Sequence, residues 1–373
     1  MPAICGAFTC AFRSDGSPRD KESETPRVFT EKATGRGHHK GYIIKKIFKP
    51  RQNPTQSCVP LVFRGAHKKT SIFLIVFLAV FVIKVCADPN EKASTAANDK
   101  PPETETRAHK VMSALAKAHP KRLSAPIFKD GDWGVLLRGK WFYYAEGRLL
   151  SNDKLPLTAT YTPQPFYNYI RDIPQWKAPS ADEAARLANA AAMRKSGTGG
   201  SRASFFYDDL WNVHNKTESY DQQKTTHFLG KQILIHHAIL EELAMVEQQI
   251  NKLALIDKTV SDWKADLRSI TSWNWRNIAD VQSRSNHAYG IAVDLQTSNP
   301  KNLETYWLWT AQKRHDWWNV PYSQRLTPPE PVIKAFETYG FIWGGKWVFY
   351  DTMHFEYRPE ILLLNNIPIT GEY

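Results

Sequence analysis

The chain has 373 residues, of which 42% are hydrophobic and 12% aromatic, so it can bury a core and is not a wholly disordered protein. Its net charge of +12 is unevenly spread, because residues 1–70 hold 14 Lys and Arg against 5 Asp and Glu, while residues 71–373 hold 35 against 32. Binding to nucleic acid needs a basic cluster on the folded part, so we expect no nucleic-acid partner.

Residues 1–70 are polar, basic and punctuated by proline, without the periodic apolar residues of a helix or strand. We expect no folded domain there: the segment is disordered, or translation starts further along, near Leu61 or Val62. All four cysteines precede Ala87. A metal site in the rest of the chain must therefore use His, Asp or Glu.

A run of thirteen residues, Ser71 to Ile83, is apolar after its first residue, with basic residues before it and Val-Cys-Ala ending at Ala87. This is the layout of a secretory signal peptide. The run is shorter than the roughly 20 residues that span a bilayer. We therefore expect residues 71–87 to be a signal peptide, with an uncleaved membrane anchor as the alternative, and an extracytoplasmic location in the periplasm or cell envelope.

Residues 88–125 are expected to form a linker, because the stretch 88–108 lacks large apolar residues. A β-rich and helical region is expected to follow over residues 126–259. Its first part, Pro126 to Ile170, is crowded with aromatic residues and Leu and is punctuated by glycine, which indicates a small β-rich unit.

Two helices are expected in the second part of that region. Ser180 is a typical N-cap for a helix that reaches Arg194, and the glycine-rich stretch 197–201 ends it. From about Gln222 to Lys258, apolar residues recur every three or four positions, which predicts one long amphipathic helix.

The sequence S-N-H-A-Y-G-I-A-V-D ends at Asp294. After Gly290, apolar residues occupy every second position, which predicts a strand with one apolar face and Asp294 on the other face. The glycine lets the chain double back, so that His287 and Asp294 can meet. The apolar face comprises Ile291, Val293 and Leu295.

A second segment, F-I-W-G-G-K-W-V-F-Y-D-T-M-H-F-E-Y, runs from Phe341 to Tyr357. In a strand from about Met353, His354 and Glu356 share the face opposite their apolar neighbours. Asp351 precedes His354 by three residues, an odd offset that puts the two on opposite faces of a regular strand. We therefore expect a turn just after Asp351, which allows both side chains to serve one site.

These two segments resemble the zinc D-alanyl-D-alanine carboxypeptidase family, the VanY-like group that includes phage L-alanyl-D-glutamate endopeptidases. The family is marked by S-x-H-x-x-G-x-A-x-D, then W-G-G-x-W, then D-x-M-H-F-E. The resemblance covers about residues 270–362, a quarter of the chain. The matching residues are Ser285, His287, Gly290, Ala292 and Asp294, then Trp343, Gly344, Gly345 and Trp347, then Asp351, Met353, His354, Phe355 and Glu356.

The resemblance implies a zinc ion held by His287, Asp294 and His354. Two imidazoles and a carboxylate leave zinc a fourth position for water, whose pKa falls toward ~7. The resemblance also implies that Asp351 is the general base that takes the proton of this water. It places Arg276 near the substrate, with Arg284 as the alternative for that role.

We therefore predict an exported α+β zinc metallopeptidase whose catalytic domain spans residues 260–373. The resemblance implies a small antiparallel sheet with flanking helices and a zinc site, a hedgehog-like fold, preceded here by the β-rich and helical region. The implied substrate is the stem peptide of peptidoglycan, cut at a D-Ala-D-Ala or an L-Ala-D-Glu type bond.

Several residues have a second interpretation. Glu356 either orients the neighbouring histidine or is a solvated strand residue. His237 and Glu241, one helical turn apart, are read as part of a polar helix face rather than a second metal site. Trp343 and Trp347 either pack in the core or form a platform on which sugars stack.

Two other functions fit the same residues. One is a non-catalytic cell-wall-binding protein that keeps the fold and the metal. The other is a zinc hydrolase that acts on a different peptide or amide. The sequence does not indicate an oligomeric state.

Overall fold

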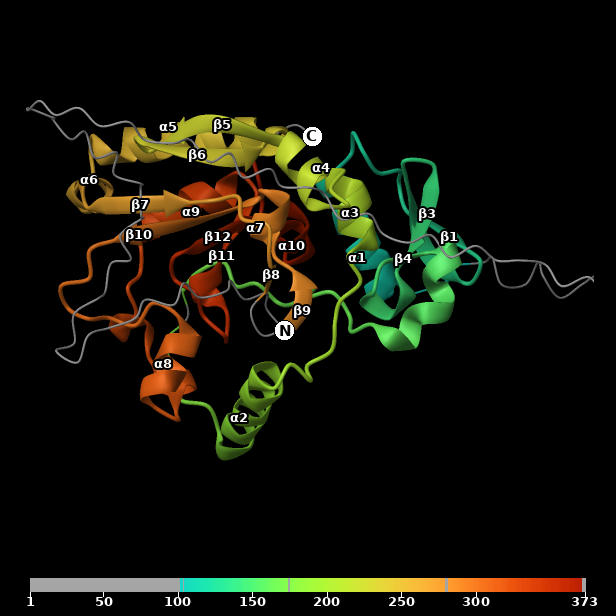
Figure 1. Cartoon of the computed structure of the whole chain (residues 1–373), viewed down its shortest axis with the longest axis horizontal. Coiled ribbons are helices and arrows are strands. Elements are labelled where there is room, and N and C mark those ends of the chain that lie inside the picture. Colours follow the sequence, from blue (N-terminus) through green and yellow to red (C-terminus); the bar gives the residue numbers. More distant parts are fainter. Residues whose placement is uncertain (1–100, 103, 174, 279–280, 371–373) are drawn as a thin grey trace, which may run out of the picture. The chain divides into compact units, whose positions relative to one another are not determined.

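The structure is a computed structural model (Figure 1). It describes residues 101–102, 104–173, 175–278 and 281–370, which lie in one compact unit. The predicted N-terminal extension, the signal segment and the first part of the linker lie outside these residues. None of the described helices is long and apolar enough to cross a membrane.

Four antiparallel strands form the sheet that carries the candidate site residues, in the order β11-β12-β10-β7. The pairing of β10 with β12 places Asp294 directly opposite His354. Strand β10 follows Gly290 as the alternation predicts, and β12 begins at His354, after the expected turn. The strands are β7 (Leu267–Thr271), β10 (Ala292–Thr297), β11 (Phe341–Trp343) and β12 (His354–Tyr357).

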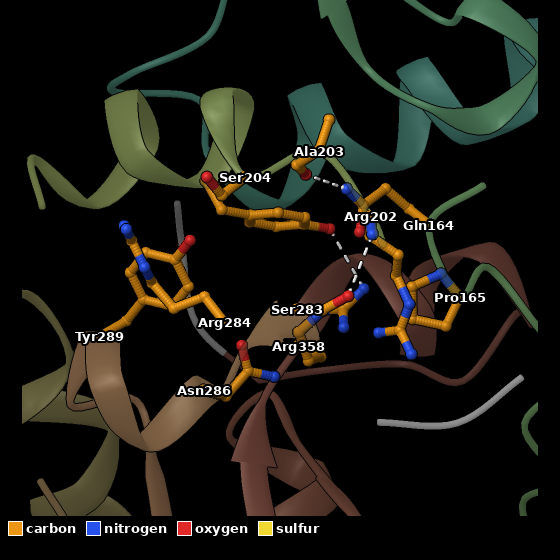
Figure 2. A pocket seen from close by; sticks show the side chains of 11 residues that line it. Gln164, Pro165, Arg202, Ala203, Ser204, Ser283, Arg284, Asn286, Tyr289 and Arg358 are labelled. Atoms are coloured by element: carbon orange, nitrogen blue, oxygen red, sulfur yellow. Dashed lines mark hydrogen bonds between the residues drawn. The ribbon is translucent and has the colours of Figure 1, made fainter. Parts of the chain in front are cut away.

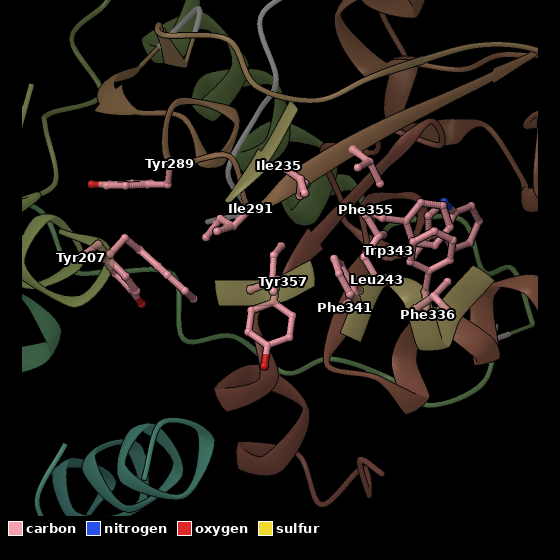
Figure 3. Packing of buried hydrophobic residues seen from close by; sticks show 14 of the residues in the cluster. Tyr207, Ile235, Leu243, Tyr289, Ile291, Phe336, Phe341, Trp343, Phe355 and Tyr357 are labelled. Carbon is pink, nitrogen blue, oxygen red and sulfur yellow. The ribbon is translucent and has the colours of Figure 1, made fainter. Parts of the chain in front are cut away.

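One face of this sheet packs against helix α9 (Glu330–Thr338), which in turn packs against α5 (Leu240–Ala254) (Figure 3). Phe336 of α9 stacks on Phe355 of β12, with ring centroids 3.9 Å apart. Each fully buried side chain of this kind contributes roughly 1.5–3 kcal/mol. Side chains alternate along a strand, so His354, which precedes Phe355 on β12, points to the face opposite α9. Asp294, its pairing partner on β10, lies on that same face.

A second antiparallel sheet, β1-β2-β3-β4, occupies the predicted β-rich unit. Helix α1 (Arg107–Ala118) packs on β2 and also on helix α10 (Pro359–Leu364). Its Val111 belongs to the same hydrophobic cluster as Phe355. The boundary expected at residue 260 therefore does not separate two cores. The strands are β1 (Ile127–Lys129), β2 (Asp132–Leu137), β3 (Lys140–Tyr143) and β4 (Leu150–Ser151).

Helix α1 lies within residues 88–125, for which the sequence predicted a linker. The hydroxyl of Thr106 caps the helix by accepting a hydrogen bond from His109 N at 3.2 Å. The buried residues Val111 and Leu115 follow at helical spacing. Folded structure therefore begins near residue 106, earlier than the composition of 88–108 suggested.

The single long helix predicted for residues 222–258 is wrong in its first part. The chain there forms a hairpin of β5 (Gln223–Phe228) and β6 (Lys231–His236), and α5 begins only after it. Leu229 and Gly230 make the turn with φ of 48° and 78°, the left-handed backbone that two-residue hairpins use. Within β6 the buried residues Ile233 and Ile235 are spaced by two, but Ile235 and Ile239 also fit the four-residue spacing of a helix.

Helix α2 (Ala181–Lys195) agrees with its prediction, because Ser180 and Glu183 form a reciprocal capping box. Its Leu187 packs against an aromatic cluster that contains Trp307 and Phe349. The remaining helices and strands are α3 (Phe205–Trp211), α4 (Lys216–Asp221), α6 (Lys258–Ala265), β8 (Asn277–Ile278), β9 (Val281–Arg284), α7 (Asn286–Tyr289) and α8 (Trp307–Lys313).

Candidate metal centre

His287 lies on the short helix α7, which two local signals define. The hydroxyl of Ser285 caps the helix by accepting a hydrogen bond from His287 N at 3.3 Å. Gly290 ends it with a φ of 73°, and a Cβ there would lie 1.9 Å from Gln223 Oε1, so that only glycine fits. The chain then turns into β10, which brings His287 Nε2 to 3.2 Å from Asp294 Oδ1.

His354 reaches the same point from β12. Its Nδ1 is 2.9 Å from Asp294 Oδ1 and 3.2 Å from His287 Nε2. One ligand atom from each residue lies within 4.8 Å of the others. His287 and His354 are 1% and 2% exposed, whereas the side chain of Asp294 is 15% exposed. The structure thus brings together the three predicted ligands, with Asp294 the most accessible to solvent.

The hydrogen bond made by the ring nitrogen that points away from Asp294 determines the tautomer of each imidazole. His287 Nδ1 lies 2.5 Å from the carbonyl oxygen of Ser272, and His354 Nε2 lies 3.0 Å from Glu356 Oε2. Carbonyl and carboxylate oxygens only accept hydrogen bonds, so these two ring nitrogens carry hydrogen. In the neutral rings, the lone pairs of His287 Nε2 and His354 Nδ1 then face the carboxylate of Asp294.

This arrangement requires positive charge at the point where the three atoms meet, either as protons on the rings or as a metal ion. Burial would raise the pKa of Asp294, but His287 and His354 outweigh it and hold the pKa well below its usual range. Tetrahedral zinc with ligands at about 2.0–2.2 Å separates its ligand atoms by ~3.3 Å. The separations of 2.9–3.2 Å between these atoms and the donor set therefore fit zinc.

Glu356 is 1% exposed and is therefore not the solvated strand residue of the alternative interpretation. Besides His354, the amide of Asn286 donates to its Oε2 at 2.7 Å. Burial raises the pKa of Glu356. The hydrogen bond and charge of His354 and the charge of Arg358 lower the pKa by more than burial raises it, so the net shift is downward. An ionised Glu356 beside His354 is placed to fix the orientation of that ring.

Asp351 lies in a turn that the W-G-G segment holds in place. Asp351 N donates to the carbonyl of Gly344 at 3.1 Å, and a Cβ on Gly344 would lie 2.7 Å from Asp351 O. Trp343 Nε1 donates to the carbonyl of Thr352 at 2.9 Å. Asp351 is 2% exposed and is not one of the three converging residues. The expected turn is therefore present, and Asp351 is a fourth buried polar residue beside the motif rather than one of the three converging ligands.

The two candidate arginines differ in their surroundings. Arg284 forms an ion pair with Asp208, donates to the carbonyl of Val213 at 2.9 Å and stacks on Trp275 at 4.6 Å. Arg276 has a buried guanidinium nitrogen, Nη1, with no hydrogen-bond partner among the described residues. Arg284 is thus bound to the scaffold, while Arg276 retains an unused donor.

The alternatives for the other residues are decided by burial and position. Trp343 and Trp347 are 0% and 3% exposed, too buried for a sugar platform, and the ring of Trp347 lies 5.4 Å from that of His354. His237 and Glu241 line a separate cavity. Among the described residues, neither is part of a group of three or more side chains that could hold a metal ion.

Sequence reasoning missed three residues that support the site. Ser272 acts through its backbone carbonyl, which no sequence pattern reveals. Asn286 lies inside the first motif, and its position beside His287 was the available signal. Arg358 is 4% exposed, and its Nη1 lies 3.6 Å from Glu356 Oε1. Residues two apart on a strand lie on the same face, so the spacing of Glu356 and Arg358 was a weak signal for this pair.

The buried His-Asp-His group on an antiparallel sheet defines a candidate metallopeptidase site. Comparison with protein families agrees: the sequence model of a D-alanyl-D-alanine carboxypeptidase family matches residues 279–357, a range that contains the three residues and Asp351. A domain family of unknown function matches residues 111–166. No curated protein and no solved structure matches the chain. The matched region is thus similar to peptidases that act on D-Ala-containing substrates.

Proposed function

We propose that the protein is an exported zinc peptidase that hydrolyses the stem peptide of peptidoglycan at a D-Ala-D-Ala or an L-Ala-D-Glu type bond. The observation that carries the proposal is the convergence of two imidazole lone pairs and one carboxylate within the region that matches the peptidase family. His287, Asp294 and His354 would hold the ion. The apolar run at 71–83 supports export to the cell envelope.

The chemistry that zinc supplies when bound is a water of lowered pKa, near ~7, and positive charge beside the scissile carbonyl. Asp351 takes the proton of the attacking water and passes it to the leaving amine. Arg276 offers its unused donor to the oxygen that gains negative charge, or to a substrate carboxylate. Glu356 keeps the imidazole of His354 oriented throughout.

Digestion of purified muropeptides tests this proposal. The protein with zinc should release D-Ala, or split the stem after L-Ala, as read by mass spectrometry, and a chelator should stop the reaction. Muropeptides that stay intact while zinc is bound would favour the non-catalytic wall-binding alternative. Cleavage of an ordinary L-peptide but not of muropeptides would favour the zinc hydrolase of different specificity.

A further inference from the structure

A cavity of ≈ 270 Å³ lies where helix α1 ends and helix α5 begins. Trp211 of α3 and Tyr357 of β12 contribute to its walls. Tyr357 follows Phe355 by two residues, so it lies on the face of the sheet opposite His354. The cavity shares no lining residue with the pocket beside Asn286 that Figure 2 shows, and none of its lining residues belongs to the metal group.

Two cations and two acids line this cavity without pairing. Lys121 and Arg122 follow α1, and Glu241 and Glu242 lie in the first turn of α5. None of the four forms an ion pair within the part of the chain that the structure describes. Opposite charges that face one cavity without contact suit a ligand that carries both charges.

Glu242 is half-buried and lacks a strong partner. Its Oε1 accepts a hydrogen bond from Tyr357 Oη at 3.4 Å, longer than the roughly 2.8 Å usual between two such oxygens. Its Oε2 is buried and has no hydrogen-bond partner among the described residues. Burial raises the pKa of Glu242, and its own backbone N–H, Tyr357 and Lys121 offset this rise only in part. An ammonium group in the cavity would supply the missing counter-charge.

Arg122 is also half-buried, and the protein engages only part of its guanidinium. Its Nη1 donates to the carbonyl of Leu210 at 2.6 Å, and the group lies over the ring of Trp211 at 5.1 Å. Its other N–H groups have no acceptor among the described residues. Burial and the charge of Arg138 lower the pKa of Arg122, while Glu242 raises it in part. Arg122 and Glu242 therefore act on each other over a separation too long for an ion pair.

We propose that this cavity binds a free amino acid, whose ammonium group pairs with Glu242 and whose carboxylate pairs with Arg122. A ligand with a single charge would meet a like charge in the same cavity, so neither a simple anion nor a simple cation suits it. The volume corresponds to about nine waters at about 30 Å³ each, which admits an amino acid with its side chain. The site is separate from the metal centre, and the inference does not rest on the proposed function.

Calorimetric titration at constant ionic strength tests whether both charges of the ligand are needed. The probes are glycine, L-alanine and L-leucine, each with its N-acetyl derivative, which lacks the ammonium group, and its amide, which lacks the carboxylate. The amino acid that binds most tightly should exceed both of its derivatives about tenfold or more in affinity. Absence of binding by all three amino acids, or equal binding by a derivative, overturns the proposal.

Glu242→Gln tests the partner of the ammonium group, because glutamine keeps the size and removes the negative charge. The affinity for the amino acid should fall about tenfold or more, whereas that for the N-acetyl derivative should not fall. Asp182→Asn, at an exposed position on α2, is the matched control and should bind the amino acid as the wild type does. Wild-type affinity in Glu242→Gln overturns the proposal.

Arg122→Lys takes the place of Glu242→Gln if circular dichroism shows that Glu242→Gln is unfolded. This variant keeps the charge but loses the planar fork that suits a carboxylate. Its affinity for the amino acid should fall several-fold, and an unchanged affinity overturns the proposal.

A chelator separates this cavity from the metal centre. The affinity for the amino acid should be the same with and without chelator, because the cavity shares no residue with the metal group. An affinity that is lost with the metal would place the amino acid at the metal centre and overturn the proposal. Binding through Glu242 in a protein that cleaves no muropeptide supports the cavity while the proposed function fails.

Discussion

The proton on each imidazole decides whether the three side chains can take a metal ion. The carbonyl of Ser272 holds one proton on the outer side of His287, and Glu356 holds one on the outer side of His354. Both inner nitrogens thereby direct their lone pairs toward the point where a cation would be held, beside Asp294 Oδ1. Glu356 therefore contributes to the metal centre without being a ligand, because it fixes which nitrogen of His354 can bind the ion.

Glu356→Gln tests this role, because glutamine keeps the size and the acceptor oxygen but removes the negative charge. We expect the affinity for zinc to fall about 10- to 100-fold, as measured by competition with a chromophoric chelator. Glu241→Gln, at an exposed position on α5, is the matched control and should bind zinc as the wild type does. A wild-type affinity in Glu356→Gln would show that the carboxylate only fills space.

Asp351→Asn separates catalysis from metal binding. The amide cannot take a proton from water, so kcat should fall by about 10²- to 10⁴-fold. Zinc content should stay that of the wild type, because Asp351 is outside the converging group. Turnover close to that of the wild type would remove Asp351 from the role of general base.

Short contacts between elements position these residues. The W-G-G segment fixes the turn at Asp351, and the pairing of β10 with β12 sets Asp294 against His354. Buried charged residues join the ends of α1 and α10 to α3. Glu360 Oε2 of α10 lies 3.9 Å from Nε2 of His119, which follows α1. Arg358, just before α10, donates to Oη of Tyr207 in α3 at 3.1 Å. This network ties the end of β12 to the N-terminal helices.

Glu360→Gln measures what this network contributes. Burial raises the pKa of Glu360, but Arg358 and His119 outweigh it and lower the pKa to about 2. The ionised carboxylate therefore stabilises the folded state above about pH 4.5, and this contribution is lost as the pH falls through about 2. The difference in free energy of unfolding between wild type and variant should be on the order of 3 kcal/mol at pH 7 and should shrink below pH 4.5 in urea titrations. A difference independent of pH would contradict an ionic role.

The sequence predicted the elements whose signals are local. The strand after Gly290, the turn after Asp351 and the cap at Ser180 each follow from a few neighbouring residues. The hairpin of β5 and β6 was missed because its apolar residues fit two periods at once. Contacts such as the Ser272 carbonyl on His287, or His119 beside Glu360, join segments far apart in the chain and leave no local pattern.

Among the described residues, the largest hydrophobic cluster includes residues from Val111 to Tyr357. The part that matches the peptidase family contributes only some of it, and helix α1 and the hairpin of β5 and β6 complete it. The region before residue 260, whose function the sequence left open, therefore supports the metal centre structurally.

Expression of residues 260–373 alone tests this dependence. Without α5 and the hairpin, the apolar face of α9 is exposed to water, without α1 that of α10 is exposed, and Arg358 loses Tyr207 of α3. We expect this fragment to lack a cooperative thermal transition by circular dichroism, whereas residues 101–373 should unfold in one. A fragment 260–373 that unfolds cooperatively would show that it is an independent domain.

The zinc content of the purified protein tests the central claim most directly. After dialysis, mass spectrometry of the metals should find about one zinc per chain in the wild type. His354→Ala should retain less than about a tenth of it, with an unchanged circular dichroism spectrum. Equal zinc in both proteins, or none in the wild type after incubation with zinc, would contradict the account.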